Sequence, residues 1–207
     1  MTDLDELAAR AAIACWRGAE GTLSRAIKDV VPLPMTILQA WLSRMGLARS
    51  VPTARREGLL AFLNDRAIPQ LRDAPNDPSP NTFSLVEKLS QEARSRDVLN
   101  GRPTSLLSKL GLAVHPELFI PYDGRVFRAL KGRGARVQRH IYSDYMTAVF
   151  AQKPAFLSTL NEKNLSSGSL GAADIMSQHL FELRALDKRL MLAGGFDKER
   201  MLRDLKS

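Results

Sequence analysis

Apolar residues recur at helical spacing along most of the chain. Near the N-terminus, a stripe of apolar positions in steps of three or four residues begins at Leu4 and ends at Ala14, the pattern of one helix face. Thr2 or Asp3 stands where a helix cap is expected, because a short polar side chain there can accept a hydrogen bond from the first turn. The pattern predicts a helix over about residues 4–14.

The same spacing predicts further helices, and no stretch alternates as a strand would. Asn81 or Thr82 is expected to cap the helix that follows the proline-rich segment 73–80, and Pro69 is expected to kink or divide the helix opened by Pro52. The fold class is therefore predicted to be all-α, with about ten helices. Those predicted outside the segment 105–130 cover 4–14, 23–31, 34–46, a longer stretch from 52, 82–98, 137–149, 154–160, 175–194 and 198–205.

The length and composition suit one globular domain. The chain has 207 residues, of which 44% are hydrophobic, enough for a continuous core. We expect a single all-α domain over 1–207. The loop near 74–80 is a candidate boundary between two lobes, although its length also fits an ordinary connection.

The charge points to a polyanionic partner. The formal net charge is +8 and the isoelectric point is near 10, which favours a polyanion such as nucleic acid as a partner, while a protein that is merely basic is the alternative. No segment has the length of a membrane span, the acidic N-terminus is unlike a secretory signal, and the single cysteine, Cys15, allows no intramolecular disulfide. We expect a cytoplasmic protein that does not bind membranes.

The segment 105–130 carries the candidate chemistry. It predicts a short helix, a connection bounded by Pro116 and Pro121, and a second helix that opens at Asp123. Lys109 lies in the first, apolar helix, and Asp123 occupies the cap position of the second. A desolvated lysine and a nearby aspartate can act as a nucleophile and its electrostatic partner. The alternative is an ordinary surface amine and an ordinary helix cap.

This segment resembles the core of the helix-hairpin-helix DNA glycosylase superfamily, and in particular the bacterial proteins similar to 8-oxoguanine DNA glycosylase. The likeness is confined mainly to residues 105–130. It rests on Ser105, Ser108, Lys109, Pro116, Phe119, Ile120, Asp123, Arg125 and Val126.

The resemblance implies roles for these residues. Lys109 would attack the sugar C1′ and form a Schiff base, and Asp123 would stabilise the positive charge that develops on the sugar. The damaged base would be flipped out of the duplex into a pocket between two lobes, with Tyr122 and Tyr142 as candidate pocket residues. The candidate nucleic-acid contacts are Arg102, Arg125, Arg128, Lys131, Arg133 and Arg136, whose alternative role is a solvated basic face.

The sequence departs from the family pattern in two places. The hairpin of the superfamily has a Gly-x-Gly before the lysine, whereas this chain has Asn100-Gly101 with no second glycine, so the hairpin is expected to be degenerate or absent. The interval from Lys109 to Asp123 is also shorter, by roughly one helical turn.

No metal or cofactor is expected, because His115, His140 and His179 are isolated from one another, and the sequence assigns no oligomeric state.

Two functions remain open: a base-excision glycosylase or lyase, and a non-enzymatic helical protein that binds nucleic acid or protein. The surroundings of Lys109 discriminate between them.

Overall fold

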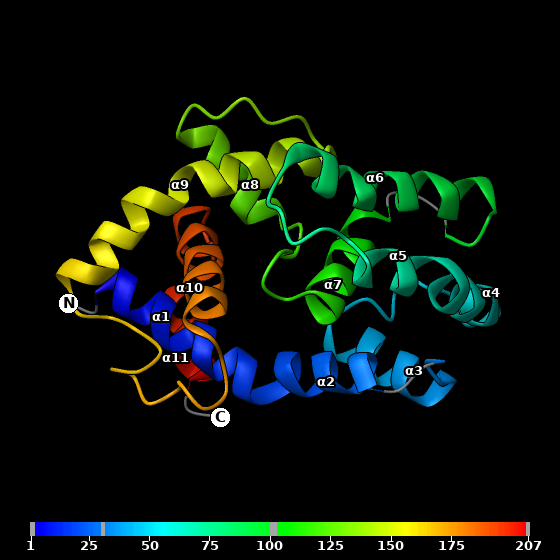
Figure 1. Ribbon diagram of the computed structural model, residues 1–207, viewed down its shortest axis with the longest axis horizontal. Coiled ribbons are helices and arrows are strands. Elements are labelled where there is room, and N and C mark those ends of the chain that lie inside the picture. The colour runs from blue at the N-terminus through cyan, green and yellow to red at the C-terminus, as the bar shows by residue number, and fades with distance from the viewer. Residues whose placement is uncertain (1–2, 30–31, 100–102, 206–207) are drawn as a thin grey trace.

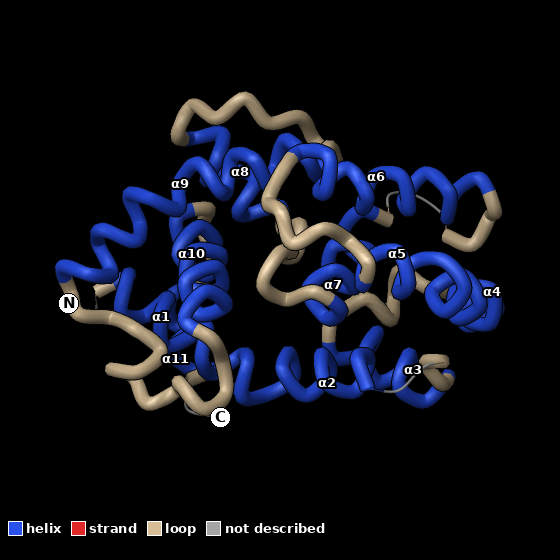
Figure 2. The backbone as a smooth tube through the Cα atoms, viewed as in Figure 1, coloured by secondary structure: helices blue, strands red, loops and turns tan. Residues whose placement is uncertain are grey.

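The computed structural model describes residues 3–29, 32–99 and 103–205. Within these ranges the chain forms helices joined by turns and loops, and no strand is present (Figure 2). The all-α prediction is confirmed. The α-helices are α1 Leu4–Cys15, α2 Gly21–Asp29, α3 Met35–Arg44, α4 Arg56–Phe62, α5 Ile68–Arg72, α6 Pro80–Ser95, α7 Thr104–Val114, α8 Gly124–Gly132, α9 Tyr142–Glu162, α10 Gln178–Ala193 and α11 Lys198–Asp204.

Helix starts follow local capping chemistry. The Asp3 side chain accepts a hydrogen bond from the Asp5 backbone and caps α1, while Thr2 lies outside the described residues. The predicted cap of α6 is wrong. Ser79, rather than Asn81 or Thr82, accepts a hydrogen bond from the Thr82 backbone N–H, because Pro80 supplies the first helical position and moves the start upstream.

The helices predicted over 137–149 and 154–160 are a single helix, α9. It begins only at Tyr142, because His140 has a φ of 70°, a left-handed conformation that no α-helix contains. Pro154 lies inside α9 instead of starting a helix, so the apolar packing on both sides of this proline outweighs the hydrogen bond that its nitrogen cannot make.

The stretch opened by Pro52 is divided, as Pro69 predicted. A 3₁₀ turn, Thr53–Arg55, precedes α4, and a π-helical turn, Leu63–Ala67, separates α4 from α5. Pro69 lies in the first turn of α5 and cannot donate a backbone hydrogen bond, so the wider turn lies directly before it.

The helices pack around one large hydrophobic core, whose fully buried side chains include Trp41, Phe83 and Phe119. Helix α1 packs along α10, α10 packs against α8, and α2 and α6 pack against α7. Figure 1 shows α7 near the middle of the molecule and both chain ends on the side of α1 and α11. Helices α5 and α6, joined by the loop that includes residues 74–79, both contact α7. A lobe boundary at this loop stays a prediction.

A second π-helical turn, Trp16–Glu20, joins α1 to α2, and Gly18 within it has non-helical dihedral angles. This turn brings Glu20 next to α10.

In the part of the chain that is described, no helix is long and apolar enough to cross a membrane.

Candidate functional site

Lys109 projects from α7 into a partly buried position. Its Nζ donates a hydrogen bond of 2.8 Å to the backbone carbonyl of Met45, at the end of α3. Burial lowers the pKa of the Lys109 amine below 10.5, while the carboxylates of Asp123 and Glu20 oppose that shift. The amine is therefore neither a freely solvated surface group nor a closed ion pair.

A pocket of about 280 Å³ adjoins Lys109 on the side of α3. Asp123 is not among the residues that line this pocket. The described residues that line it are Gly46, Leu47, Ser50, Val51, Leu99, Pro103, Ser105, Leu106 and Lys109.

Hydroxyl groups hold the connection that leads from α7 to Asp123. Ser108 in α7 accepts a hydrogen bond of 2.8 Å from the Tyr122 backbone N–H. The hydroxyls of Tyr142 and Tyr145, at the start of α9, donate to the carbonyls of Ile120 and Pro121 at 2.6 and 2.9 Å. These bonds fix the backbone immediately before Asp123 from two neighbouring helices.

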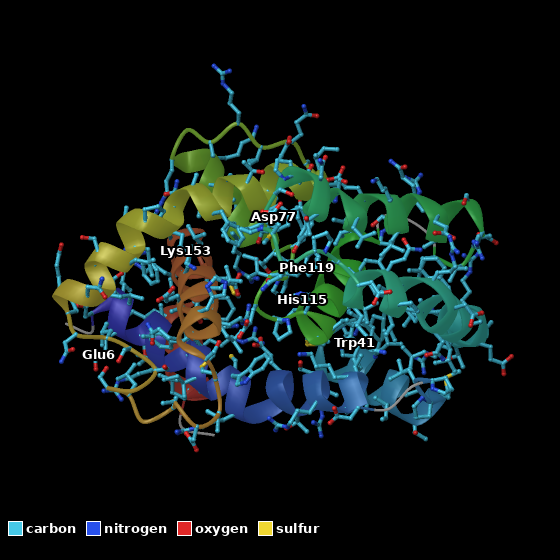
Figure 3. All side chains as sticks on the ribbon, viewed as in Figure 1. Glu6, Trp41, Asp77, His115, Phe119 and Lys153 are labelled. Carbon is cyan, nitrogen blue, oxygen red and sulfur yellow. The ribbon has the colours of Figure 1, made fainter. Side chains whose placement is uncertain are left out.

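Close packing reinforces the same connection. A Cβ atom at Gly111 would lie 2.9 Å from the Phe119 ring, so α7 approaches the connection at a distance that only glycine permits. Phe119 also contacts the His115 ring, with centroids 6.3 Å apart, and Figure 3 shows both side chains near the centre of the molecule.

Asp123 caps α8, as predicted. Its Oδ1 accepts a hydrogen bond of 2.7 Å from the Arg125 backbone N–H, and its own backbone N–H lies 3.4 Å from the Tyr145 hydroxyl. The side chain is partly exposed. Asp123 makes no ion pair with Lys109, although its charge acts on the amine. The structure therefore brings the two predicted residues into one region without direct contact.

A buried ion cluster lies beside this pair and was not predicted. It consists of Glu20 and three side chains of α10, namely Arg184, Asp187 and Lys188. Arg184, which is fully buried, donates to both Glu20 oxygens at 2.6 and 2.7 Å and to Asp187 Oδ2 at 2.8 Å. Lys188 Nζ lies 3.5 Å from Glu20.

The charges within this cluster determine how its members titrate. Glu20 is desolvated, which alone would raise its pKa, but Arg184 and Lys188 outweigh that effect and hold the pKa at about 2. The sequence signal for the cluster was available: three charged residues at i, i+3 and i+4 interrupt an apolar helix face near Leu183, Leu186 and Leu190. Charged residues on such a face are rarely buried unless they are paired.

The predicted nucleic-acid contacts have mixed surroundings. Arg125 lies over the Phe196 ring at 5.1 Å, and Arg128 donates to the Gly194 carbonyl at 3.2 Å, so both help to pack the end of α10. Lys131 and Arg133 are exposed, with Arg133 donating to Gln152, and Arg136 is exposed in the loop after α8. Arg102 lies outside the described residues. Figure 1 shows this loop, residues 133–141, along the outer edge of the molecule.

Tyr122 and Tyr142, the predicted pocket residues, are both buried. Tyr142 is fully covered, and its ring lies against Phe119 and Tyr145. Tyr122 is 8% exposed, and its hydroxyl accepts a hydrogen bond from the His140 backbone. In the free protein these rings support the Asp123 connection and present little surface to a base.

Among the described residues, no group of three or more His, Cys, Asp or Glu side chains is arranged to hold a metal ion. Comparisons of the chain with protein-family models, with curated proteins and with solved structures gave no match.

Proposed function

We propose that this protein is a DNA base-excision glycosylase or abasic-site lyase that uses Lys109 as its nucleophile and Asp123 as the electrostatic partner. The observation that carries the proposal is the state of Lys109. Its amine is partly buried, has a lowered pKa and donates a hydrogen bond to the Met45 carbonyl. The charge of Asp123, whose side chain caps α8, also acts on this amine. A surface lysine has none of these features.

The hydrogen bond to Met45 is compatible with attack. A neutral amine has two N–H donors and one lone pair, so one N–H can stay on the carbonyl while the lone pair approaches the sugar C1′. The carbon–nitrogen bond to the base then breaks, the base departs with the electron pair, and the amine proton is released. The carboxylate of Asp123 favours the positive charge that forms on the sugar.

The basic surface supports the same class of partner. Lys131 is exposed in the last turn of α8, and Arg133 and Arg136 are exposed in the segment that follows it. Helix α8 is the helix that Asp123 caps. Phosphate contacts from such residues position a duplex without reading its sequence.

Borohydride trapping tests the proposal. Duplex DNA with an abasic site, and the same duplex with 8-oxoguanine, would be incubated with the protein and reduced, with Lys109→Ala as the control. We expect a covalent adduct that Lys109→Ala abolishes while its thermal unfolding stays close to that of the wild type. A folded wild-type protein that forms no adduct on either duplex would contradict the proposal and favour a binding protein.

The pH dependence of trapping is a second test. Attack requires the neutral amine, whose fraction rises with pH. Because burial lowers the pKa of Lys109, the initial rate of adduct formation should rise with pH and level off below pH 10.5. A rate that keeps rising up to that pH would indicate an unperturbed surface lysine.

A further inference from the structure

A small cavity of about 80 Å³ lies between α1, α10 and the end of the chain that includes α11. These helices lie together on the side of the molecule where both chain ends are found (Figure 1). Most of the cavity wall is apolar and includes Ala11, Ala14, Met191, Phe196 and Met201. Ala14, Met191 and Phe196 are partly exposed, so a small molecule can reach the cavity from solvent.

Lys188 supplies the charge in this wall. Among the described residues that line the cavity, it is the only one with an ionised side chain. It is 7% exposed, and its only hydrogen bond in the described part of the chain is a long one, 3.5 Å from Nζ to Glu20. An ammonium group has three N–H donors, and buried donors without acceptors are costly. The amine of Lys188 can therefore serve a further acceptor.

The buried ion cluster is a row of alternating charges that ends at Lys188. Arg184 lies between two carboxylates, those of Asp187 and Glu20. Glu20 in turn lies between two cations, Arg184 and Lys188. Lys188 has a carboxylate as one neighbour and lines the cavity. An anion in the cavity would give Lys188 the second neighbour of opposite charge that Arg184 and Glu20 already have.

The titration of the cluster favours an anion over a cation. Burial alone would lower the pKa of Lys188, but Glu20 outweighs that effect and raises it, so the amine stays charged. The pKa of Glu20 is held at about 2. Burial raises the pKa of Asp187, so this carboxylate is the first in the cluster to lose its charge as the pH falls.

We propose that this cavity binds a short aliphatic carboxylate, whose oxygens accept hydrogen bonds from Lys188 Nζ while its hydrocarbon end packs against Met191 and Phe196. An apolar cavity of about 150 Å³ binds benzene, so one of this size has room for roughly three to five non-hydrogen atoms, as in acetate or propionate. The site is independent of the proposed excision chemistry, since neither Lys109 nor Asp123 lines it.

Cys15 provides a direct readout of occupancy. It lines the same cavity, is partly exposed and is the only cysteine in the chain. Alkylation of the full-length protein by iodoacetamide, followed by intact mass, therefore reports on this position alone. We expect sodium propionate to slow alkylation in a saturable way, with half-protection on the order of millimolar for so small a ligand. Equal slowing by sodium chloride at the same concentration would overturn the proposal.

Propionamide tests the charge of the ligand on the wild-type protein. It has nearly the same shape as propionate but no negative charge, so it cannot form a charge-assisted hydrogen bond with Lys188. We expect half-protection of Cys15 to require about tenfold more propionamide than propionate. Equal protection by the two compounds, or protection by neither, would overturn the proposal, and this comparison does not depend on the folding of any variant.

Lys188→Met removes the ammonium and keeps an apolar side chain of similar length. We expect half-protection by propionate to require about 10- to 100-fold more ligand, as for loss of a hydrogen bond to a charged group. Lys153→Met is the matched control, because Lys153 pairs with Glu182 on α10 but does not line the cavity. This control should be protected like the wild type. Unchanged protection in Lys188→Met, or equal loss in both variants, would overturn the role of Lys188.

Discussion

At the residue scale, Asp123 combines a structural and an electrostatic role in one side chain. Its Oδ1 caps α8 through the Arg125 backbone, and its charge acts on the Lys109 amine. A loss of activity on removing this side chain is therefore ambiguous, because the helix start would loosen at the same time.

Two substitutions at Asp123 separate these roles. Asp123→Ala removes the cap and should lower the free energy of unfolding by about 1 kcal/mol, whereas Asp123→Asn keeps a capping oxygen and should cost only a few tenths of that. Urea denaturation measures both variants. Equal destabilisation would show that the cap is not the source of the difference.

The asparagine variant also predicts a shift in the pH profile. The negative charge of Asp123 raises the pKa of Lys109 against the effect of burial. Removing that charge should lower the pKa further, so the midpoint of adduct formation should move to lower pH while the plateau rate falls. A midpoint that stays unchanged would show that the two residues do not interact.

At the element scale, the end of α10 determines where α8 can lie. A Cβ atom placed on Gly194 would come within 1.9 Å of the Arg125 backbone carbonyl oxygen, so the helix capped by Asp123 packs on a position that excludes any side chain. Arg128 adds a hydrogen bond to the Gly194 carbonyl. The position of the proposed site thus depends on a contact far along the sequence.

Gly194→Ala should accordingly destabilise the protein. Because backbone rather than a flexible side chain occupies the space, we expect a loss of roughly 1–3 kcal/mol or more. Thermal unfolding would measure it, with Gly58→Ala as the control. Gly58 is an exposed position in α4 with open space at its Cβ, so alanine there should be neutral or stabilising by about 0.5–1 kcal/mol. Similar results for both variants would argue against the close contact.

At the scale of the whole molecule, the charge of +8 predicts how DNA binding should depend on salt. Each phosphate contact releases counterions, so the logarithm of affinity falls linearly with the logarithm of salt concentration. The binding of DNA should therefore weaken strongly between low and physiological salt. The part of the affinity that comes from phosphate contacts should vary little with DNA sequence.

Arg136→Ala tests this interpretation at one exposed position of the loop after α8. We expect the magnitude of the salt slope to fall by about 0.9, measured by fluorescence anisotropy on unrelated duplexes. Arg10→Ala serves as control, because Arg10 lies on α1 and pairs with Glu6. An equal change in the salt slope for the two variants would indicate that DNA is attracted by the overall positive charge and not by a defined surface of the protein.

The sequence by itself determined the all-α class, most helix positions and the cap at Asp123, because hydrophobic spacing and capping are local properties. It misjudged the start of α9 and the role of Pro154, where the left-handed His140 and long-range packing outweigh local signals. Only the tertiary structure decided that Lys109 binds the Met45 carbonyl, that Tyr142 supports the connection from the core, and that Glu20 meets Arg184 across 164 positions. Those contacts join residues distant in sequence, and their energies depend on burial, which no local pattern specifies.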